Sequence, residues 1–274
     1  MTDEAVFVHD GDGYIATELG LGPWYPGALH GGAPAALIAH TLAESVSDPG
    51  LRLARITYEL VRPVMAGPMS VSLEMVRPGR RVTLLDAFVR DGAGVEVMRA
   101  RGLFVRPSAI AAGSDQPPPF PGPEDGVAND WVRGEPMFAT HAMELRFVQG
   151  SFGGVGPSTA WFRLRVPLIA SEPVLGIDRV ATAGDLGNGI GTELDWASHS
   201  FINPDLTLYV ERDPVDEWVA LQSQMRVVQG SVAIAQSVLW DRHGRIGQAL
   251  QTLLVDRHDP AHAPAAVVTS GGTP

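Results

Sequence analysis

The chain has 274 residues, of which 45% are hydrophobic and 19% are charged, and its formal net charge is −11. It contains no cysteine, and all 20 of its basic residues are arginines. This composition excludes disulfides, thiol nucleophiles and thiolate metal sites, and also Schiff-base and P-loop lysines. The acidic balance argues against a nucleic-acid partner, because neutralising phosphates requires clustered cations.

The sequence carries no sign of a membrane span or of export. No hydrophobic run reaches the length of a spanning helix, and the first residues, MTDEAVFVHDGDG, are acidic where a secretory signal begins with basic residues. We therefore expect a cytoplasmic protein without a membrane span. Its length exceeds that of a typical single domain, which favours two domains or one large two-layer unit.

The first predicted helix covers residues 31–46, GGAPAALIAHTLAESV. Leu37, Ile38 and Leu42 form its apolar set, and Pro34 is tolerated because it lies in the first turn. The segment is rich in Gly and Ala. A sheet could therefore approach the axis of this helix closely.

Several segments predict β-strands. Residues 69–73 and 161–166 alternate between apolar and polar side chains, which indicates antiparallel sheets with one solvated face. Residues 78–80, 91–92 and 243–244 contain glycine between such segments and are predicted hairpin turns. Each half of the chain therefore combines a small-residue helical segment with several strands joined by tight turns.

The sequence resembles itself on either side of a proline-rich stretch, residues 107–126, which has the composition of a linker. At a shared offset of 150, the matched pairs are Thr57 and Thr207, Arg62 and Arg212, Asp91 and Asp241, Gly94 and Gly244, and Val105 and Val255. We interpret this as a tandem duplication. The expected units are a first repeat in residues 1–106, the linker 107–126, a second repeat in residues 127–258, and a disordered tail in residues 259–274.

The helical segment expected in the second repeat, residues 183–197, reads AGDLGNGIGTELDWA and contains four glycines. Each interior glycine costs about 1 kcal/mol relative to alanine. Propensity alone would not make this segment helical, so only burial could hold it.

One small-residue helix enclosed by a curved antiparallel sheet, occurring twice, describes an α+β double hotdog fold. The sequence resembles the acyl-CoA thioesterase II type of tandem hotdog protein over most of residues 20–258. The resemblance is carried by ALHGGAPAALIAHTLAE, RITYELVRP, the acidic residue of AGDLGNG, NPDLTLYVER and the glutamine of QALQTLLV. It implies two repeats, each with a central helix wrapped by a curved antiparallel sheet, and hydrolysis of acyl-CoA to free acid and CoA.

The resemblance also implies a water-activating trio of Asp, Thr and Gln in the second repeat. The Asp falls on Asp185 and the Gln on Gln251, whereas Asn203 stands where the family has Thr. Thioester hydrolysis needs a carboxylate base, groups that orient the water, and donors for the carbonyl oxygen. Structural roles stay open for all three: a helix N-cap for Asp185, an outward strand position for Gln251, and a turn before Pro204 for Asn203.

In the first repeat, His30 takes the place of Asp185 and Arg101 takes that of Gln251, which suggests that one of two ancestral sites has lost its chemistry. Amides at a helix start favour negative charge, and glycine lets a substrate approach the backbone. His30 could bind an acyl or phosphate group at the helix start, and Arg101 could pair with CoA phosphates. The residues expected to bind substrate are therefore His30, Gly31, Gly32, Gly187, Gly189 and Arg101. A structural role for His30 and a solvated strand position for Arg101 remain alternatives.

Two further functions remain open. An acyl-CoA hydratase on the same fold would use a carboxylate and a histidine as base and acid, and it predicts His30 or His199 within reach of Asp185. A non-catalytic acyl-CoA or lipid binder would account for Asn203 in place of Thr. We expect no metal and no cofactor, an acyl thioester on CoA or acyl carrier protein as partner, and a homodimer or higher homo-oligomer.

Overall fold

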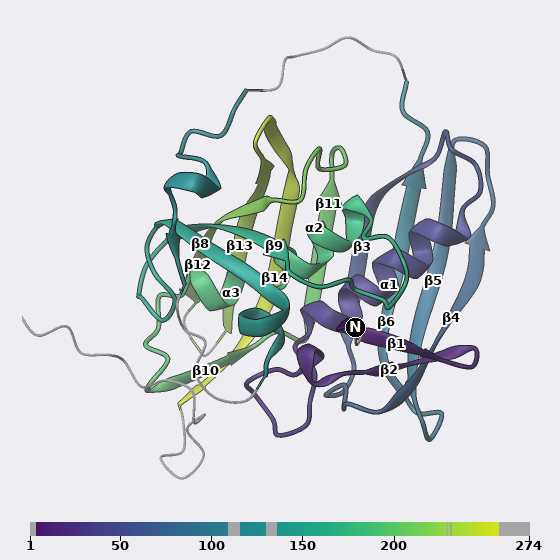
Figure 1. The fold of residues 1–274 in the computed structure, drawn as a ribbon, viewed down its shortest axis with the longest axis horizontal. Helices are drawn as coiled ribbons and strands as arrows, with labels where there is room; N and C mark the ends of the chain where they lie inside the picture. Colours follow the sequence, from purple (N-terminus) through teal and green to yellow (C-terminus); the bar gives the residue numbers. More distant parts are fainter. Residues whose placement is uncertain (1–3, 109–115, 130–135, 229, 231, 258–274) are drawn as a thin grey trace, which may run out of the picture.

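The computed structural model describes residues 4–108, 116–129, 136–228, 230 and 232–257. A large antiparallel sheet curves around two helices, α1 (Gly32–Ser45) and α2 (Gly176–Gly184), which pack against each other within it (Figure 1). This is the expected α+β arrangement. The termini of the two helices position the candidate site described below.

The described strands fall into two groups, six in the first half of the chain and eight in the second. The first half contains β1 (Phe7–Asp10), β2 (Gly13–Ala16), β3 (Arg52–Leu60), β4 (Pro68–Arg77), β5 (Val82–Asp91) and β6 (Glu96–Val105), with the short helix η1 (Glu18–Gly20). The second half contains β7 (Val127–Ala128), β8 (Met143–Gln149), β9 (Ser158–Leu164), β10 (His199–Ile202), β11 (Asp205–Val210), β12 (Val219–Val228), β13 (Val232–Asp241) and β14 (Gly244–Arg257), with the short helices η2 (Pro123–Asp125), η3 (Phe138–Ala142) and α3 (Gly187–Ile190).

The strand order is the same in both halves when it is followed from each edge of the sheet toward the middle. It runs β1-β2-β4-β5-β6-β3 from one edge and β7-β8-β9-β12-β13-β14-β11 from the other, where β7 is an addition and β10 pairs separately with β14. The halves meet where β3 pairs with β11, and Thr57 lies directly opposite Thr207. These two residues are also a matched pair at the sequence offset of 150. Pairing of equivalent residues at the centre of a sheet is the arrangement that a repeated unit with internal two-fold symmetry produces.

Helix α1 closely matches the predicted segment. The sheet makes room for a large side chain of this helix: a Cβ on Gly102 of β6 would lie 3.1 Å from Leu42 Cδ1. Leu37, Ile38 and Leu42 are fully buried. The predicted hairpins at residues 78–80, 91–92 and 243–244 connect β4 to β5, β5 to β6, and β13 to β14.

The second central helix begins earlier than expected. Helix α2 starts at Gly176, where Ile177, Val180 and Ala181 form a buried apolar face, and it ends before Asp185. The glycine-rich residues that follow form only the single turn α3, in which every residue is buried. Glycine is required directly after this turn, because a Cβ on Gly191 would lie 2.8 Å from the backbone of Ser223.

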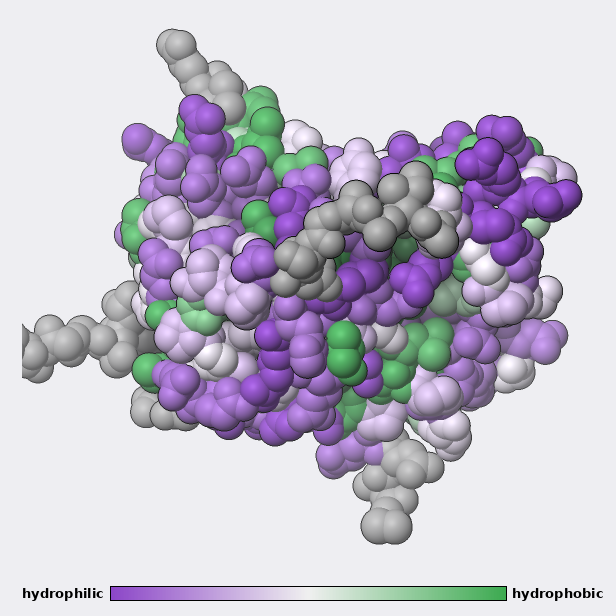
Figure 2. All heavy atoms as spheres, turned by 90° about the horizontal axis from the view of Figure 1, so that it is seen from above, coloured by the Kyte–Doolittle hydropathy of each residue, from purple (hydrophilic) through white to green (hydrophobic). Residues whose placement is uncertain are grey.

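The proline-rich segment ends against the outer face of the second half. Trp161 Nε1 donates a hydrogen bond to Pro121 O at 2.9 Å, and the ring of Phe120 packs against the edge of the Trp161 ring. Seen from above, hydrophilic side chains cover most of the visible surface, with hydrophobic residues in small groups (Figure 2). Residues 109–115 and the predicted tail, residues 259–274, lie outside the described residues. Within the described part of the chain, no helix is long and apolar enough to cross a membrane.

Candidate active site

Helices α1 and α2 run in opposite directions, so the start of α1 lies beside the end of α2. A Cβ on Gly32 would lie 3.1 Å from Thr182 O at this end, and His40 Nδ1 lies 2.9 Å from Asp178 Oδ2 at the other. His30 precedes α1 and Asp185 follows α2. The two residues therefore do not occupy equivalent places in two repeats, as the sequence alignment suggested, but belong to one site.

Asp185 accepts two side-chain hydrogen bonds on the same carboxylate oxygen, Oδ1. Asn203 Nδ2 donates at 2.8 Å and Gln251 Nε2 at 3.2 Å. All three side chains are buried, with 4%, 7% and 2% of Asp185, Asn203 and Gln251 exposed. The structure thus brings the three residues of the predicted trio together from α2, the start of β11 and β14. Asp185 lies after a helix rather than at a helix N-cap.

Gln251 points inward from β14 and connects three backbone elements. Its Nε2 also donates to Asp185 O at 3.1 Å, and its Oε1 accepts from the amide of Asn188 in α3 at 3.1 Å. Asn203 Nδ2 also donates to Asp205 O at 3.1 Å, so Asn203 stabilises the turn into β11 as well as Asp185. Both amides act directly on the carboxylate, whereas the sequence interpretation had them hold a water.

His30 contacts the second carboxylate oxygen of Asp185. Its Nδ1 lies 3.2 Å from Asp185 Oδ2 and 3.1 Å from the amide nitrogen of Gly32. An unprotonated Nδ1 accepts from the amide, and a protonated Nδ1 donates to the carboxylate. The same nitrogen can therefore take up or release a proton beside Asp185. His199 lies on β10, where its Nδ1 is 2.9 Å from Ser198 Oγ.

The loop that carries His30 is anchored at both ends. The amide of His30 donates to Gly20 O at 2.9 Å, and the amide of Leu29 donates to Val64 O at 2.7 Å. Trp24, in the same loop, stacks on Trp196 of the other half with ring centroids 5.1 Å apart. These contacts fix the histidine relative to Asp185.

Gly31 and Gly32 allow the two helix ends to meet. A Cβ on Gly31 would lie 2.8 Å from Asp185 Oδ2, which is closer than a Cβ normally approaches another atom. A Cβ on Gly32 would lie 3.1 Å from the ring of Phe138 and from Thr182 O. Glycine is therefore needed here for close approach to the carboxylate.

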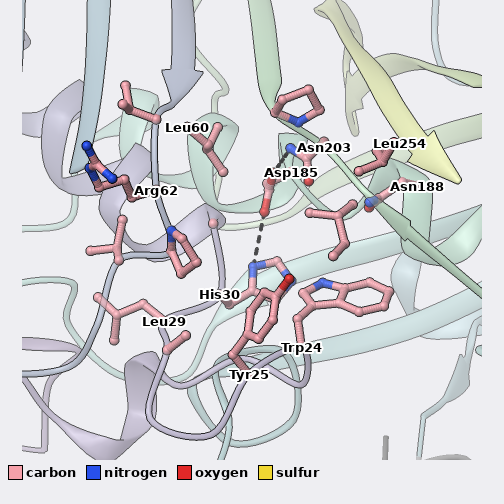
Figure 3. Close-up of a pocket in the computed structure, with 17 residues that line it drawn as sticks. Trp24, Tyr25, Leu29, His30, Leu60, Arg62, Asp185, Asn188, Asn203 and Leu254 are labelled. Carbon is pink, nitrogen blue, oxygen red and sulfur yellow. Dashed lines mark hydrogen bonds and ion pairs between the residues drawn. The ribbon is translucent and has the colours of Figure 1, made fainter. Parts of the chain in front are cut away.

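Asp185 and His30 open into a pocket of about 230 Å³ that both halves of the chain line (Figure 3). The first half contributes Trp24, Tyr25, Ala28, Leu29, His30, Gly31, Leu60, Val61, Arg62, Pro63 and Val64, and the second contributes Asp185, Asn188, Ile202, Asn203, Pro204 and Leu254. The lining is mainly apolar, with a few polar groups at Asp185, which is the usual composition of a small-molecule site. Figure 3 shows Arg62 and Leu60 on one side of the His30–Asp185 contact and Leu254 on the other.

Four residues expected to bind substrate do not line this pocket: Gly32, described above, and Gly187, Gly189 and Arg101. Arg101 is exposed on the outer face of the sheet and forms a bidentate pair with Asp86, at 2.6 and 2.7 Å, whose hydrogen bonds raise the pKa of Arg101. Gly187 packs under β13, where its Cβ would lie 2.4 Å from Ser237 Oγ. The amide of Gly189 donates to Leu186 O.

The position of Arg101 has a simple geometric reason. The offset of 150 matches it with Gln251, but Arg101 lies opposite Thr57 whereas Leu250 lies opposite the matching Thr207, so the strands β6 and β14 are offset by one residue. A slip of one residue turns a side chain from one face of a sheet to the other. Arg101 consequently faces solvent, whereas Gln251 faces the helices.

Sequence reasoning missed Asn188 and Arg62 as pocket residues. Asn188 lies between Gly187 and Gly189, which were both expected to bind substrate, and its Nδ2 donates to Phe201 O at 3.3 Å. In the sequence, Arg62 is distinguished only as the match of Arg212. The available signal was its position directly after β3. Strand β3 pairs with β11 where the two halves meet, and the ends of these strands border the pocket.

A buried tyrosine connects strand β3 to helix α1. Tyr58 is fully buried, and its hydroxyl donates to Ala35 O at 3.1 Å. Burial, and then the nearby carboxylates of Asp178 and Asp185, raise the pKa of Tyr58 well above its usual value. Tyr58 therefore stays protonated and serves as a fixed donor to α1.

Comparison with known structures identifies a hotdog-type fold. A protein of unknown function with a hotdog fold from Alicyclobacillus acidocaldarius matches with a TM-score of 0.70 and 16% identity, over 94% of this chain and 97% of the other. An acyl-CoA thioesterase II of Mycobacterium marinum matches with a TM-score of 0.65 and 16% identity, over 91% and 95%. The tesB protein of Mycobacterium avium matches with a TM-score of 0.63 and 17% identity, over 91% and 96%.

The sequence itself gives the family. The model of the acyl-CoA thioesterase N-terminal domain matches residues 21–105, and that of the C-terminal domain matches residues 113–255. The chain therefore belongs to the acyl-CoA thioesterase family, as its motifs indicated. A search among curated proteins gave no match.

Proposed function

We propose that the protein hydrolyses acyl-CoA, or an acyl thioester on another carrier, to the free acid and the thiol. The observation that carries the proposal is the environment of Asp185. Its carboxylate is buried, accepts two amide hydrogen bonds on Oδ1, and faces His30 through Oδ2 at the edge of a largely apolar pocket. A carboxylate fixed in this way can act as a general base towards a water molecule.

The proposed reaction is direct attack by water. Asp185 takes a proton from the water as its oxygen attacks the thioester carbonyl carbon, which gives a tetrahedral oxyanion. Collapse of this intermediate breaks the carbon–sulfur bond, and the leaving thiolate receives the proton from Asp185 by way of His30. The 3.2 Å separation of Asp185 Oδ2 and His30 Nδ1 supports this transfer. Asn203 and Gln251 are positioning residues that hold the carboxylate in place.

The amide of Gly31 is the proposed donor to the oxyanion. Gly31 lines the pocket at the start of the 14-residue helix α1, where the helix dipole favours negative charge. The amide of Gly32 instead donates to His30, and those of Asn188, Gly189 and Gly191 donate to other groups near α3. We therefore assign the oxyanion to the first helix rather than to α3.

We also propose that the two halves form a double hotdog derived from a duplication. The repeated strand order and the pairing of Thr57 with Thr207 support this origin. The repeats would correspond to residues 1–106 and 127–258. The active site then lies between the repeats, and each contributes part of it.

The contact between His30 and Asp185 favours a second candidate, hydration of an enoyl thioester. A carboxylate and a histidine can together deliver water to a conjugated double bond, and the hydratase alternative predicted this contact. The family match favours thioester hydrolysis. Incubation of the wild-type protein with an enoyl-CoA separates the two, since hydration removes the conjugated double bond and leaves the thioester intact, whereas hydrolysis releases free thiol.

Asp185→Asn tests the proposed base. The substitution keeps the size of the side chain but removes its basicity, so kcat for thiol release from a panel of acyl-CoAs should fall by about 10² to 10⁴. Asp178→Asn is the matched control: Asp178 is a second buried aspartate of α2 that does not line the pocket. This variant should keep kcat within about threefold of the wild-type value. Its Tm should fall, because the buried His40 loses its charged partner.

Two outcomes would contradict the proposal. Thiol release by Asp185→Asn at the wild-type rate would exclude Asp185 as the base. A wild-type protein that binds acyl-CoA without releasing thiol from any member of the panel would instead identify a non-catalytic binder.

A further inference from the structure

We infer that Arg62 binds a phosphate group of the carrier portion of the substrate. The inference rests on the proposed function and adds a residue to its site. Arg62 follows β3 and lines the pocket that holds Asp185. Among the described residues of this lining it is the only arginine, and Asp185 is the only acid. The pocket thus has a cation on one side and the proposed catalytic carboxylate in the same lining.

The matching residue in the second half is used differently. Arg212 forms a bidentate pair with Asp241, with nitrogen–oxygen distances of 2.5 and 2.7 Å. Burial alone would raise the pKa of Asp241, but hydrogen bonds from Arg212 and from the amides of Val215 and His243 outweigh it and lower the pKa to about 2. Asp241 therefore stays ionised, and Arg212 is committed to a structural ion pair.

Arg62 lacks the equivalent partner. Asp91, which matches Asp241, accepts hydrogen bonds from the amides of Ala93 and Val95 in its own hairpin, at 3.0 and 2.9 Å. Within the described residues Arg62 takes part in none of the ion pairs, although Arg99 and Arg90 nearby both pair with Glu96. Arg62 is an exposed residue, so its side chain is accessible to a ligand.

The backbone explains why the two arginines diverge. After β3, the chain is drawn to the loop that carries His30: the amide of Leu29 donates to Val64 O at 2.7 Å, and the amide of Ala66 donates to Gly27 O at 2.8 Å. After β11, the amide of Val215 instead donates to Asp241 at 3.0 Å. The contact that anchors the His30 loop therefore also directs Arg62 to the pocket.

The chemistry of the position favours a phosphate. Coenzyme A and the phosphopantetheine arm of a carrier protein both present phosphate groups, and a guanidinium can bind a phosphate through two parallel hydrogen bonds. An exposed side chain suits a group that stays hydrated, whereas an acyl chain would be placed among buried apolar groups. The net charge of −11 repels a carrier that bears several negative charges. A cation beside the pocket therefore contributes more to binding this carrier than it would on a neutral protein.

Arg62→Gln tests the inference with three thioesters of the same acyl group. On acyl-CoA, KM should rise about tenfold or more while kcat changes less than about twofold, as expected for loss of a hydrogen bond to a charged group. On the N-acetylcysteamine thioester, which has no phosphate, neither value should change. An acyl-phosphopantetheine thioester then identifies which phosphate Arg62 binds. A raised KM for this substrate would indicate the phosphate that both carriers share. An unchanged KM would indicate a phosphate that only coenzyme A has. The KM difference should shrink at high salt.

Arg99→Gln is the matched control. It makes the same change of charge on the outer face of the neighbouring strand β6, where Arg99 pairs with Glu96, and KM for acyl-CoA should stay at the wild-type value. Calorimetric titration with free coenzyme A gives a readout that does not depend on catalysis, and Kd should rise only for Arg62→Gln. Equal effects of Arg62→Gln on the phosphate-free thioester, or an unchanged Kd and KM for the coenzyme A ligands, would overturn the inference whether or not hydrolysis is observed.

Discussion

The two ends of the α1–α2 seam contain similar residues in different surroundings. At one end, His30 and Asp185 line a pocket. At the other, His40 lies between two acids, with Nδ1 2.9 Å from Asp178 Oδ2 and Nε2 2.8 Å from Glu172 Oε2. Glu172 also contacts His9 at 2.6 Å. A histidine paired with an acid is therefore not sufficient for a site; access to the carboxylate is what separates the two ends.

The helices account for this difference in access. Helix α1 continues past His40 to Ser45, and Asp178 lies in the first turn of α2, where it also accepts from the amide of Leu175 at 2.8 Å. At the pocket end, α2 stops at Gly184, so Asp185 is free of regular helical structure and can be held by side chains. We interpret the His40 cluster as structural and the His30 cluster as catalytic.

After removal of the Asp185 carboxylate itself, the largest expected effect comes from filling the space beside it at the pocket end. In Gly31→Ala, the new Cβ would lie 2.8 Å from Asp185 Oδ2 and would displace the carboxylate or the helix start. We expect kcat to fall about 10²- to 10³-fold, as when a donor to an oxyanion is lost. Gly92→Ala is the control, because its Cβ would be 3.5 Å from the nearest atom, an ordinary contact. Steady-state kinetics of both variants measure the effect, and wild-type activity in Gly31→Ala would remove the pocket end from the mechanism.

A smaller effect is expected from the side chain that departs from the family pattern. Asn203→Ala removes the 2.8 Å hydrogen bond to Asp185 Oδ1, and we expect kcat to fall about tenfold, which corresponds to about 1.4 kcal/mol. Asn203→Thr supplies a hydroxyl donor and should recover most of this loss. Comparison of kcat for the three proteins measures it. If Ala and Thr variants were equally active, Asn203 would be part of the turn alone.

The smallest effect concerns the other end of the seam and appears in stability. Burial alone would lower the pKa of His40, but hydrogen bonds and charges of Asp178 and Glu172 outweigh it and raise the pKa. The folded state therefore binds this proton more tightly than the unfolded state. The resulting stability is fully present below pH 6.5, the usual pKa, and is lost as pH rises through the raised pKa.

The Tm of the wild type should accordingly fall by a few degrees as the pH rises above about 6.5. The pKa of Asp178 is also raised, mainly by burial, and the pKa of Tyr14 is raised by burial and by Glu172. His40→Gln should flatten the Tm profile in this window without changing kcat. Parallel profiles of the two proteins would show that His40 carries no linked proton.

The first helix and most strands could be predicted from the sequence because their patterns are local. The helix needed only the spacing of Leu37, Ile38 and Leu42, and the hairpins needed only glycines between alternating segments. Asp185, Asn203 and Gln251 were found through resemblance to a family. Spacing alone would not have joined them, since they come from three separate elements.

The remaining parts depended on tertiary contacts. The second helix was placed at its glycines instead of at Gly176, because burial under the sheet, rather than propensity, shapes residues 187–190. Arg101 was assigned to the wrong face because one residue of slippage reverses a strand's faces. The meeting of His30 with Asp185 required the antiparallel crossing of α1 and α2, which no local pattern specifies.

The direct pairing of Thr57 with Thr207 has a consequence for how such a molecule can change. In an assembly of two identical subunits, each residue occurs in both subunits. A substitution that improves one end of the interface therefore alters the other end in the same way. A single chain that supplies both halves removes this constraint. One end can keep a reactive carboxylate while the other acquires a buried ionic cluster, because mutation and selection act on the two ends separately.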